Sequence, residues 1–175
     1  MDTEYPPFEF GISRIVDCGF MIEEAVKAEP NKVRLGYSMN FLFDVPNSWI
    51  QFNVRADFQH SETGITFLSG TVLTRFSINN LSGFLDDDKK VVFPKGVLES
   101  LFGIAFSHMR AILAKNIAGS RFTNVYVPVI DTQVVFNELL KRNIEVAKKL
   151  NEDLASENAD NDVAENIYSP PSKGS

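Results

Sequence analysis

The side chains able to carry out chemistry in this chain are few and widely separated. The chain contains one cysteine, Cys18, and two histidines, His60 and His108. A catalytic thiol or hydroxyl needs a base beside it, and no Asp or Glu follows His108 three or four residues later. A Cys18–His108 pair stays open, although nothing in the local sequence supports it. We therefore interpret His108 as a core or interface histidine and His60 as a solvated turn residue.

Carboxylates and motifs give no stronger sign of an active site. Asp86, Asp87 and Asp88 are followed directly by Lys89 and Lys90, a pattern typical of a solvated turn rather than of a cation site. A lone cysteine forms neither an internal disulfide nor a cysteine-based metal site. The patterns of dinucleotide-binding proteins, P-loop NTPases, zinc proteases and serine hydrolases do not occur. The sequence therefore predicts a protein that is not an enzyme, with no catalytic residues, metal or cofactor.

The charge of the chain is concentrated at its C-terminal end. The formal net charge is −6, and residues 151–175 hold six carboxylates against one lysine, so residues 1–150 carry only −1. No basic stripe that would neutralise phosphates occurs, which argues against nucleic acid as a partner. The first residues, MDTEYPPFEF, lack the basic and apolar segments of a signal peptide, and no run of about 18 apolar residues predicts membrane insertion. We expect a reduced, cytoplasmic protein.

Four segments in the first half of the chain alternate apolar and polar residues with the period of two that is typical of half-buried strands. They are residues 8–20, 35–43, 50–58 and 65–78. The first segment slips in phase between Asp17 and Phe20, which predicts a bulge at Cys18 and Gly19. Short turns join the last three segments, whereas the link 24–32 is long enough for a crossover. The pattern predicts an antiparallel sheet with one solvated face.

Two helices follow the strands. The first is predicted from about residue 94 to Gly119, and the second from Asp131 or Thr132 to about residue 150. The first helix is apolar on nearly all sides, so we expect it to be buried on nearly all sides. One sheet face cannot bury such a helix alone, and we therefore expect its far side to meet another subunit. The residues assigned to this oligomer interface are Phe102, Phe106, Met109, Ile112 and Leu113.

Together these elements predict an α+β fold in which a four-stranded antiparallel sheet is covered by two C-terminal helices. We expect residues 1–150 to form a single domain and residues 151–175 to form a disordered acidic tail, because the tail is acidic and then rich in Pro, Ser and Gly. Hot-dog thioesterases also combine such a sheet with a long buried helix. In that alternative, Glu99 is the candidate catalytic carboxylate, although the helix dipole favours a carboxylate there in any case.

Several segments, in order, resemble the SecB family of protein-export chaperones. FGISRI at 10–15 is similar to the opening strand of the family, F-x-I-x-R-I, and RFSI at 75–78 is similar to its G-x-F-S-I segment. Residues 105–112, which include Arg110, resemble the P-Y-A-R-E-x-I segment of its first helix. Gly119, Phe122, Val125 and Pro128 match the connector pattern G-T-F-P-x-L-x-L-x-P-V-x-F, and FNELL at 136–140 matches F-M-N-Y-L with one extra residue after the proline.

The resemblance implies a SecB-like domain that assembles as a dimer of dimers, a homotetramer, with the long first helices paired at its centre. It implies an ATP-independent holdase that binds unfolded preproteins for export in apolar, aromatic grooves, several of which on one assembly would multiply the affinity. The matching groove candidates are Val125, Tyr126, Val127, Val134 and Phe136, with Phe41, Phe43 and Trp49 as additions from the sheet. For Phe41 and Phe43, a place in the core is the favoured interpretation.

The chain departs from the family in the acidic patch that docks the translocation ATPase SecA. Glu23 falls on one of those acidic positions, whereas Gly19 and Ser69 fall where other acidic groups are expected. Two further interpretations therefore stay beside the export holdase. One is a SecB-like chaperone dedicated to a single client, such as an antitoxin, without an export role. The other is the hot-dog-like enzyme.

Overall fold

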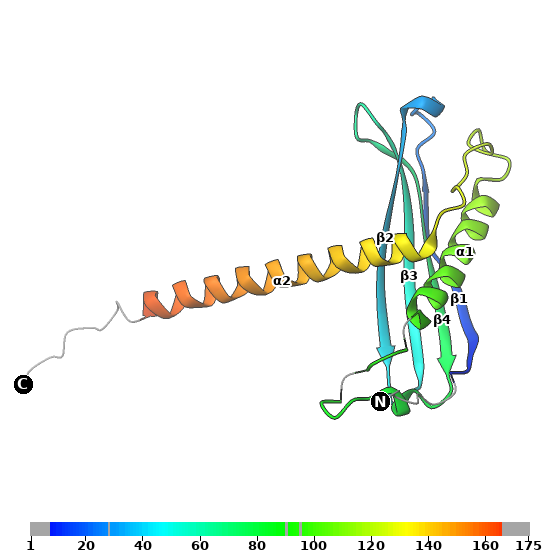
Figure 1. Ribbon diagram of the computed structural model, residues 1–175. Coiled ribbons are helices and arrows are strands. Elements are labelled where there is room, and N and C mark those ends of the chain that lie inside the picture. The colour runs from blue at the N-terminus through cyan, green and yellow to red at the C-terminus, as the bar shows by residue number, and fades with distance from the viewer. Residues whose placement is uncertain (1–7, 28, 90, 95, 166–175) are drawn as a thin grey trace, which may run out of the picture. The chain divides into compact units, whose positions relative to one another are not determined.

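The computed structural model describes residues 8–27, 29–89, 91–94 and 96–165. A four-stranded antiparallel sheet is followed by two C-terminal helices, so the predicted α+β class is confirmed (Figure 1). The strands are β1 (Phe10–Ile22), β2 (Val33–Asp44), β3 (Trp49–His60) and β4 (Thr66–Ile78), and the helices are α1 (Val97–Ile117) and α2 (Thr132–Glu165). Two short 3-10 helices, Pro30–Lys32 and Leu81–Phe84, lie before β2 and after β4.

The order of the strands in the sheet is β1-β4-β3-β2. Hairpin turns join β2 to β3 and β3 to β4, while the link 23–32 carries the chain from one edge of the sheet to the other, as its length predicts. Among the described residues, β1 and β2 are therefore the two edge strands, and each has one side without a neighbouring strand there. Unpaired strand edges are places where another chain can add.

β1 contains two irregularities that keep its apolar side chains on one face. The register against β4 shifts between Asp17 and Gly19, which confirms the predicted bulge, and also between Ile12 and Arg14. Ile12 pairs with Phe76 before the shifts, and Phe20 pairs with the buried Gly70 after them. Since paired residues in an antiparallel sheet share a face, the bulges return the chain to the face that β4 presents to the core.

The core lies between α1 and one face of the sheet (Figure 1). Phe52 on β3 lies 6.4 Å from the ring of Phe102 on α1 and 6.2 Å from Phe76 on β4. Gly70 allows the closest approach of α1, because a Cβ added there would lie 2.8 Å from Cδ1 of Leu113. The buried residues of α1 are Leu101, Phe102, Ala105, Phe106, Met109, Leu113 and Ile117.

The C-terminal end of α1 and the N-terminal end of α2 lie close to the predicted capping residues. Gly119, two residues after the end of α1, has a φ of +80°, a conformation that glycine adopts without strain. Asp131 caps α2, because its Oδ1 accepts hydrogen bonds from the backbone N–H groups of Gln133 (3.0 Å) and Val134 (3.2 Å). Both predicted boundaries between these helices are therefore close to the observed ones.

The far end of α2 differs from the expectation. The helix continues to Glu165, whereas the sequence analysis ended it near residue 150 and assigned the following residues to a tail. No Gly or Pro interrupts residues 132–165, which explains why the helix can continue. The remaining part of that predicted tail, 166–175, lies outside the described residues. The chain divides into two compact units, Met1–Leu139 and Leu140–Ser175.

α1 is apolar enough to meet a criterion for membrane-spanning helices, although the sequence analysis found no run of about 18 apolar residues. An 18-residue window within Val97–Ile117 has a mean hydropathy of 1.4, so by length and composition alone this helix could cross a membrane. The core helix of a folded domain meets the same criterion when one side is apolar and the other is built from small residues. In this structure seven side chains of α1, including those of Phe102 and Phe106, are buried within the protomer, and 33% of the apolar window is buried.

Candidate functional site

The connector between α1 and α2 is held to the sheet and to α1 at two points. Phe122 is buried and stacks on Phe67 of β4, with ring centroids 5.3 Å apart. Val127 is also buried, and its carbonyl oxygen accepts a hydrogen bond of 3.2 Å from Nε of Arg110 on α1. Between and beyond these anchors the chain presents apolar side chains to solvent: Tyr126 is 76% exposed and Val129 is 84% exposed.

Two hollows lie beside the connector and share Val125 and Tyr126. The first, of about 360 Å³, separates the connector from α1 and is lined by Ser107, Arg110, Ala111, Leu113, Ala114, Ile117, Val125, Tyr126 and Val127. The second, of about 590 Å³, lies toward the sheet and is lined by Lys27, Val33, Phe58, Arg121, Phe122, Asn124, Val125 and Tyr126. We refer to these two hollows and the ridge of Val125 and Tyr126 between them as the connector groove.

The connector groove contains three of the eight predicted groove residues, namely Val125, Tyr126 and Val127. The side chain of Val134, in the first turns of α2, is exposed but does not line either hollow. Phe136 is only 3% exposed and contacts Phe102 with ring centroids 5.5 Å apart, so it belongs to the core. Its assignment to the groove is therefore corrected, because tertiary packing and not sequence position buries it.

The sheet residues assigned to the groove do not join the connector groove either. Phe41 on β2 stacks on Phe52 of the core at 5.7 Å, which agrees with the favoured core interpretation. Phe43 lies on the same edge strand and is 48% exposed, so the core interpretation favoured for it is wrong. Trp49 projects from the opposite face of the sheet, where the guanidinium of Arg75 lies 4.2 Å from its ring. These three side chains are therefore not neighbours of Tyr126 in either hollow.

The predicted oligomer interface on α1 is corrected for four of its five residues, and the assignment of Ile112 stays a prediction. Phe102, Phe106, Met109 and Leu113 are buried within the protomer, and Ile112 is half-buried. The exposed side of α1 carries the small residues Ser107, Ala111 and Ala114 instead. A nearly uniform apolar helix hides which side meets the sheet, but residue size would have shown it, because the large side chains follow one stripe and the small ones follow another.

The sequence analysis did not identify an apolar strip on β1. Phe10, Ile12 and Ile15 lie on the α1 side of the sheet, and they are 43%, 49% and 44% exposed because β1 is an edge strand. We call these three residues the β1 strip. Alternation in the sequence reveals the face of each side chain, but only the strand order shows which strand lies at the edge of the sheet.

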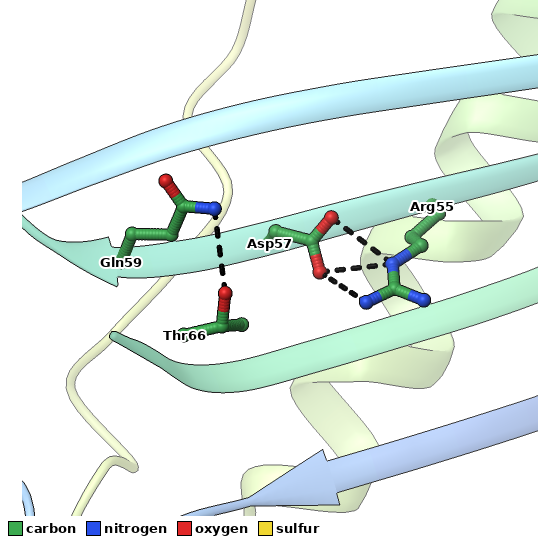
Figure 2. Close-up of polar contacts among 4 residues, drawn as sticks. All are labelled: Arg55, Asp57, Gln59 and Thr66. Carbon is green, nitrogen blue, oxygen red and sulfur yellow. Dashed lines mark hydrogen bonds and ion pairs between the residues drawn. The ribbon is translucent and has the colours of Figure 1, made fainter. Parts of the chain in front are cut away.

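The other face of the sheet is polar, as predicted. Arg55 forms an ion pair of 2.7 Å with Asp57, and the amide of Gln59 donates to Oγ1 of Thr66 at 3.3 Å (Figure 2). The hydrogen bond of Asp57 is the main reason that the pKa of Arg55 lies above its usual value. Glu23, the candidate for partner docking, is exposed just after β1, where its carboxylate accepts a hydrogen bond of 3.0 Å from the N–H of Ala25.

An open depression of about 370 Å³ brings together the two side chains that an enzyme interpretation would use, Glu99 and His108. Each already has a hydrogen-bond partner. The carboxylate of Glu99 accepts a hydrogen bond of 3.0 Å from the side-chain amide of Asn137, and Nδ1 of His108 lies 3.1 Å from Oγ1 of the buried Thr74. Burial holds the pKa of His108 below its usual value, which favours the neutral ring. Ser107, also in the depression, donates to the backbone carbonyl of Gly103.

That depression shows no nucleophile bonded to a base. The described hydrogen bonds of Ser107, Cys18 and His108 go to other groups: Cys18 is an exposed free thiol whose Sγ lies 3.7 Å from the carbonyl oxygen of Val16. His60 lies at the end of β3, half-buried. Within the described part of the chain, no three His, Cys, Asp or Glu side chains are grouped so as to hold a metal ion.

Comparison with known proteins adds no family assignment. No family model and no curated protein matches this chain.

Proposed function

We propose that this protein is a SecB-like holdase chaperone that binds unfolded polypeptides without ATP, and that it is not an enzyme. The observation that carries the proposal is the connector groove, in which Tyr126 is presented to solvent by a connector that is held in place by Phe122 and Val127. A fixed, exposed aromatic beside open hollows suits the apolar side chains of an extended chain. Such a surface needs no cofactor to bind its clients.

The proposal includes a homo-oligomer, with a dimer of dimers as the expected assembly in the cytoplasm. The β1 strip supports association, because it is a row of large apolar side chains beside an unpaired strand edge. An oligomer would bring several connector grooves together and increase the avidity for one long unfolded chain.

Of the two chaperone interpretations, the charge pattern favours the one without SecA. The resemblance leads us to expect carboxylates at positions 19, 23 and 69. Of these, only position 23 is acidic, because the chain has Gly19 and Ser69 at the other two. The carboxylate of Glu23 also accepts a hydrogen bond from its own turn. We therefore propose a general or client-dedicated holdase, and we expect docking to the translocation ATPase to be weak.

The first test combines Tyr126→Ser with Val129→Ser and follows the aggregation of a chemically unfolded protein by light scattering. Removing two exposed apolar contacts should raise the chaperone concentration needed for half suppression by about tenfold, because each contact contributes about 0.7 kcal/mol. Phe136 is left intact, since its replacement would open the core. Ile65→Ser, an exposed apolar residue in the turn between β3 and β4, is the matched control. Equal suppression by all three proteins would count against the connector groove.

A further inference from the structure

The charged residues that line the connector groove all have the same sign. Arg110 lines the hollow beside α1, and Lys27 and Arg121 line the hollow toward the sheet. Neither set of lining residues includes an Asp or a Glu. The folded part of the chain is nearly neutral overall, with a net charge of −1 over residues 1–150, so this local excess of positive charge does not reflect the composition.

Arg110 is held in position by one hydrogen bond, and its other N–H donors are not used by that bond. Its Nε donates to the carbonyl oxygen of Val127, which ties the half-buried side chain to the connector. No hydrogen bond or ion pair to its two Nη atoms occurs within the described part of the chain. A guanidinium that is oriented by one bond and open at its other nitrogens is well suited to accept a carboxylate.

Arg121 is fixed in a similar way on the other side of Tyr126. Its Nη2 donates to the carbonyl oxygen of Val26, and its guanidinium lies 4.7 Å from the ring centroid of Phe122. Among described residues it forms no ion pair, and neither does Lys27. By contrast, Lys32 is paired with both Glu29 and Glu62, and Arg55 with Asp57. The groove cations thus have no carboxylate partner among the described residues, unlike Lys32 and Arg55.

The cations and the apolar ridge alternate along the connector groove. Arg110 lies in one hollow, Val125 and Tyr126 form the ridge, and Lys27 and Arg121 lie in the other hollow. An extended segment that placed apolar side chains on the ridge would carry its flanking residues into the two hollows. Carboxylates in those flanks would meet unpaired cations, whereas lysines or arginines would meet like charge.

We propose that the connector groove selects extended polypeptide segments whose apolar or aromatic residues are flanked by aspartate or glutamate. This preference rests on the proposed holdase function and narrows its client class. Each exposed or half-buried ion pair adds only a modest amount to affinity, so the charges tune the choice of segment while the apolar ridge supplies the basic attraction.

The test uses three labelled peptides of about twelve residues, long enough to span about 40 Å when extended. All share one apolar, aromatic centre, and they differ only in flanks of Glu, Gln or Lys. Fluorescence anisotropy with the full chain at low salt should give a dissociation constant about tenfold lower for the Glu peptide than for the Gln peptide, and a higher one for the Lys peptide. Added salt should narrow these differences.

Variants assign the preference to the two arginines. Arg121→Gln and Arg110→Gln should each reduce the ratio between the dissociation constants of the Gln and Glu peptides measured on the same variant, because each removes a cation that would meet the Glu flanks. Arg55→Gln, on the opposite sheet face, is the control and should change neither. Equal binding of all three peptides to the original protein would overturn the charge preference alone, whereas binding of none would overturn the holdase proposal with it.

Discussion

The Tyr37 side chain fits its surroundings in all but its hydroxyl group. Its ring contacts Phe106 edge-on, with centroids 5.2 Å apart. The hydroxyl oxygen is buried and has no hydrogen-bond partner among the described residues. Burial raises the pKa of Tyr37, because the ionised form would lose still more solvation than the neutral one. A buried polar group without a partner is a cost to folding that a hydrocarbon ring would avoid.

Tyr37→Phe should therefore raise the free energy of unfolding by about 1 kcal/mol, because it removes the unpartnered hydroxyl and keeps the ring contact. Urea denaturation followed by circular dichroism measures the change. Tyr126→Phe removes a hydroxyl from a side chain that is largely exposed, and we expect no change in that control. A loss of stability in Tyr37→Phe would show that the hydroxyl has a partner after all.

Single residues also show where reasoning from the sequence succeeds and where it stops. Asp131 and Thr132 were the two candidate caps of the second helix from their types and positions, and the backbone hydrogen bonds show that Asp131 is the cap. Tyr126 and Phe136 were assigned to the same groove, yet one is largely exposed and the other is buried against Phe102. Both are apolar residues near the connector, and only tertiary packing distinguishes them.

At the scale of elements, the contact between α1 and β4 depends on the absence of a side chain at Gly70. A Cβ there would lie 2.8 Å from Cδ1 of Leu113, which is itself buried. Gly36 on β2 is the contrasting case, because a Cβ added there would meet no atom within 4 Å. The helix can lie so close to the sheet only because the facing strand carries glycine at the point of contact.

Gly70→Ala should lower the free energy of unfolding by about 1–2 kcal/mol, since Leu113 must leave its packed position to make room. Gly36→Ala should raise it by up to about 0.5 kcal/mol, because alanine restricts the unfolded chain and has space in the folded one. Denaturant titrations of the two variants side by side provide the comparison. If Gly70→Ala proved as stable as the original chain, α1 would not be anchored where the structure places it.

The elements also differ in how well the sequence predicted their details. The bulge at Cys18 and Gly19 was predicted because the alternation of apolar residues visibly changes phase there. The second shift, between Ile12 and Arg14, was missed because Ile15 and Val16 are both apolar, so the pattern does not record which one faces the core. The end of α2 was missed because polar composition predicts solvent exposure and does not by itself end a helix.

At the scale of the whole molecule, the proposed holdase is an assembly of more than one copy of the chain. The β1 strip exposes nearly half of each of three large apolar side chains beside an unpaired edge, and a surface of this kind is expected to be covered in solution. The order of strands was needed to find it. The sequence analysis had assigned the oligomer interface to α1 residues that the protomer itself buries.

The protein should behave as a homo-oligomer at micromolar concentration, and Ile12→Glu should shift it toward the 19.6 kDa protomer by placing a charge in the interface. We expect the association constant to fall at least about tenfold, since burying an unpaired carboxylate is costly. Light scattering coupled to size exclusion measures the mass. Ile65→Glu, a charge at a similarly exposed apolar site away from the strip, should leave it unchanged. A monomeric original protein would refute the proposed assembly.

The most direct test of the holdase proposal is the mass of a complex formed without ATP. The purified protein is mixed with a client that cannot refold, such as a reduced and alkylated globular protein, and the mixture is analysed by size exclusion with light scattering. The account predicts a single species whose mass equals that of one oligomer plus one bound client. Separate elution of an intact oligomer and the free client would contradict the claim that this protein holds unfolded polypeptides.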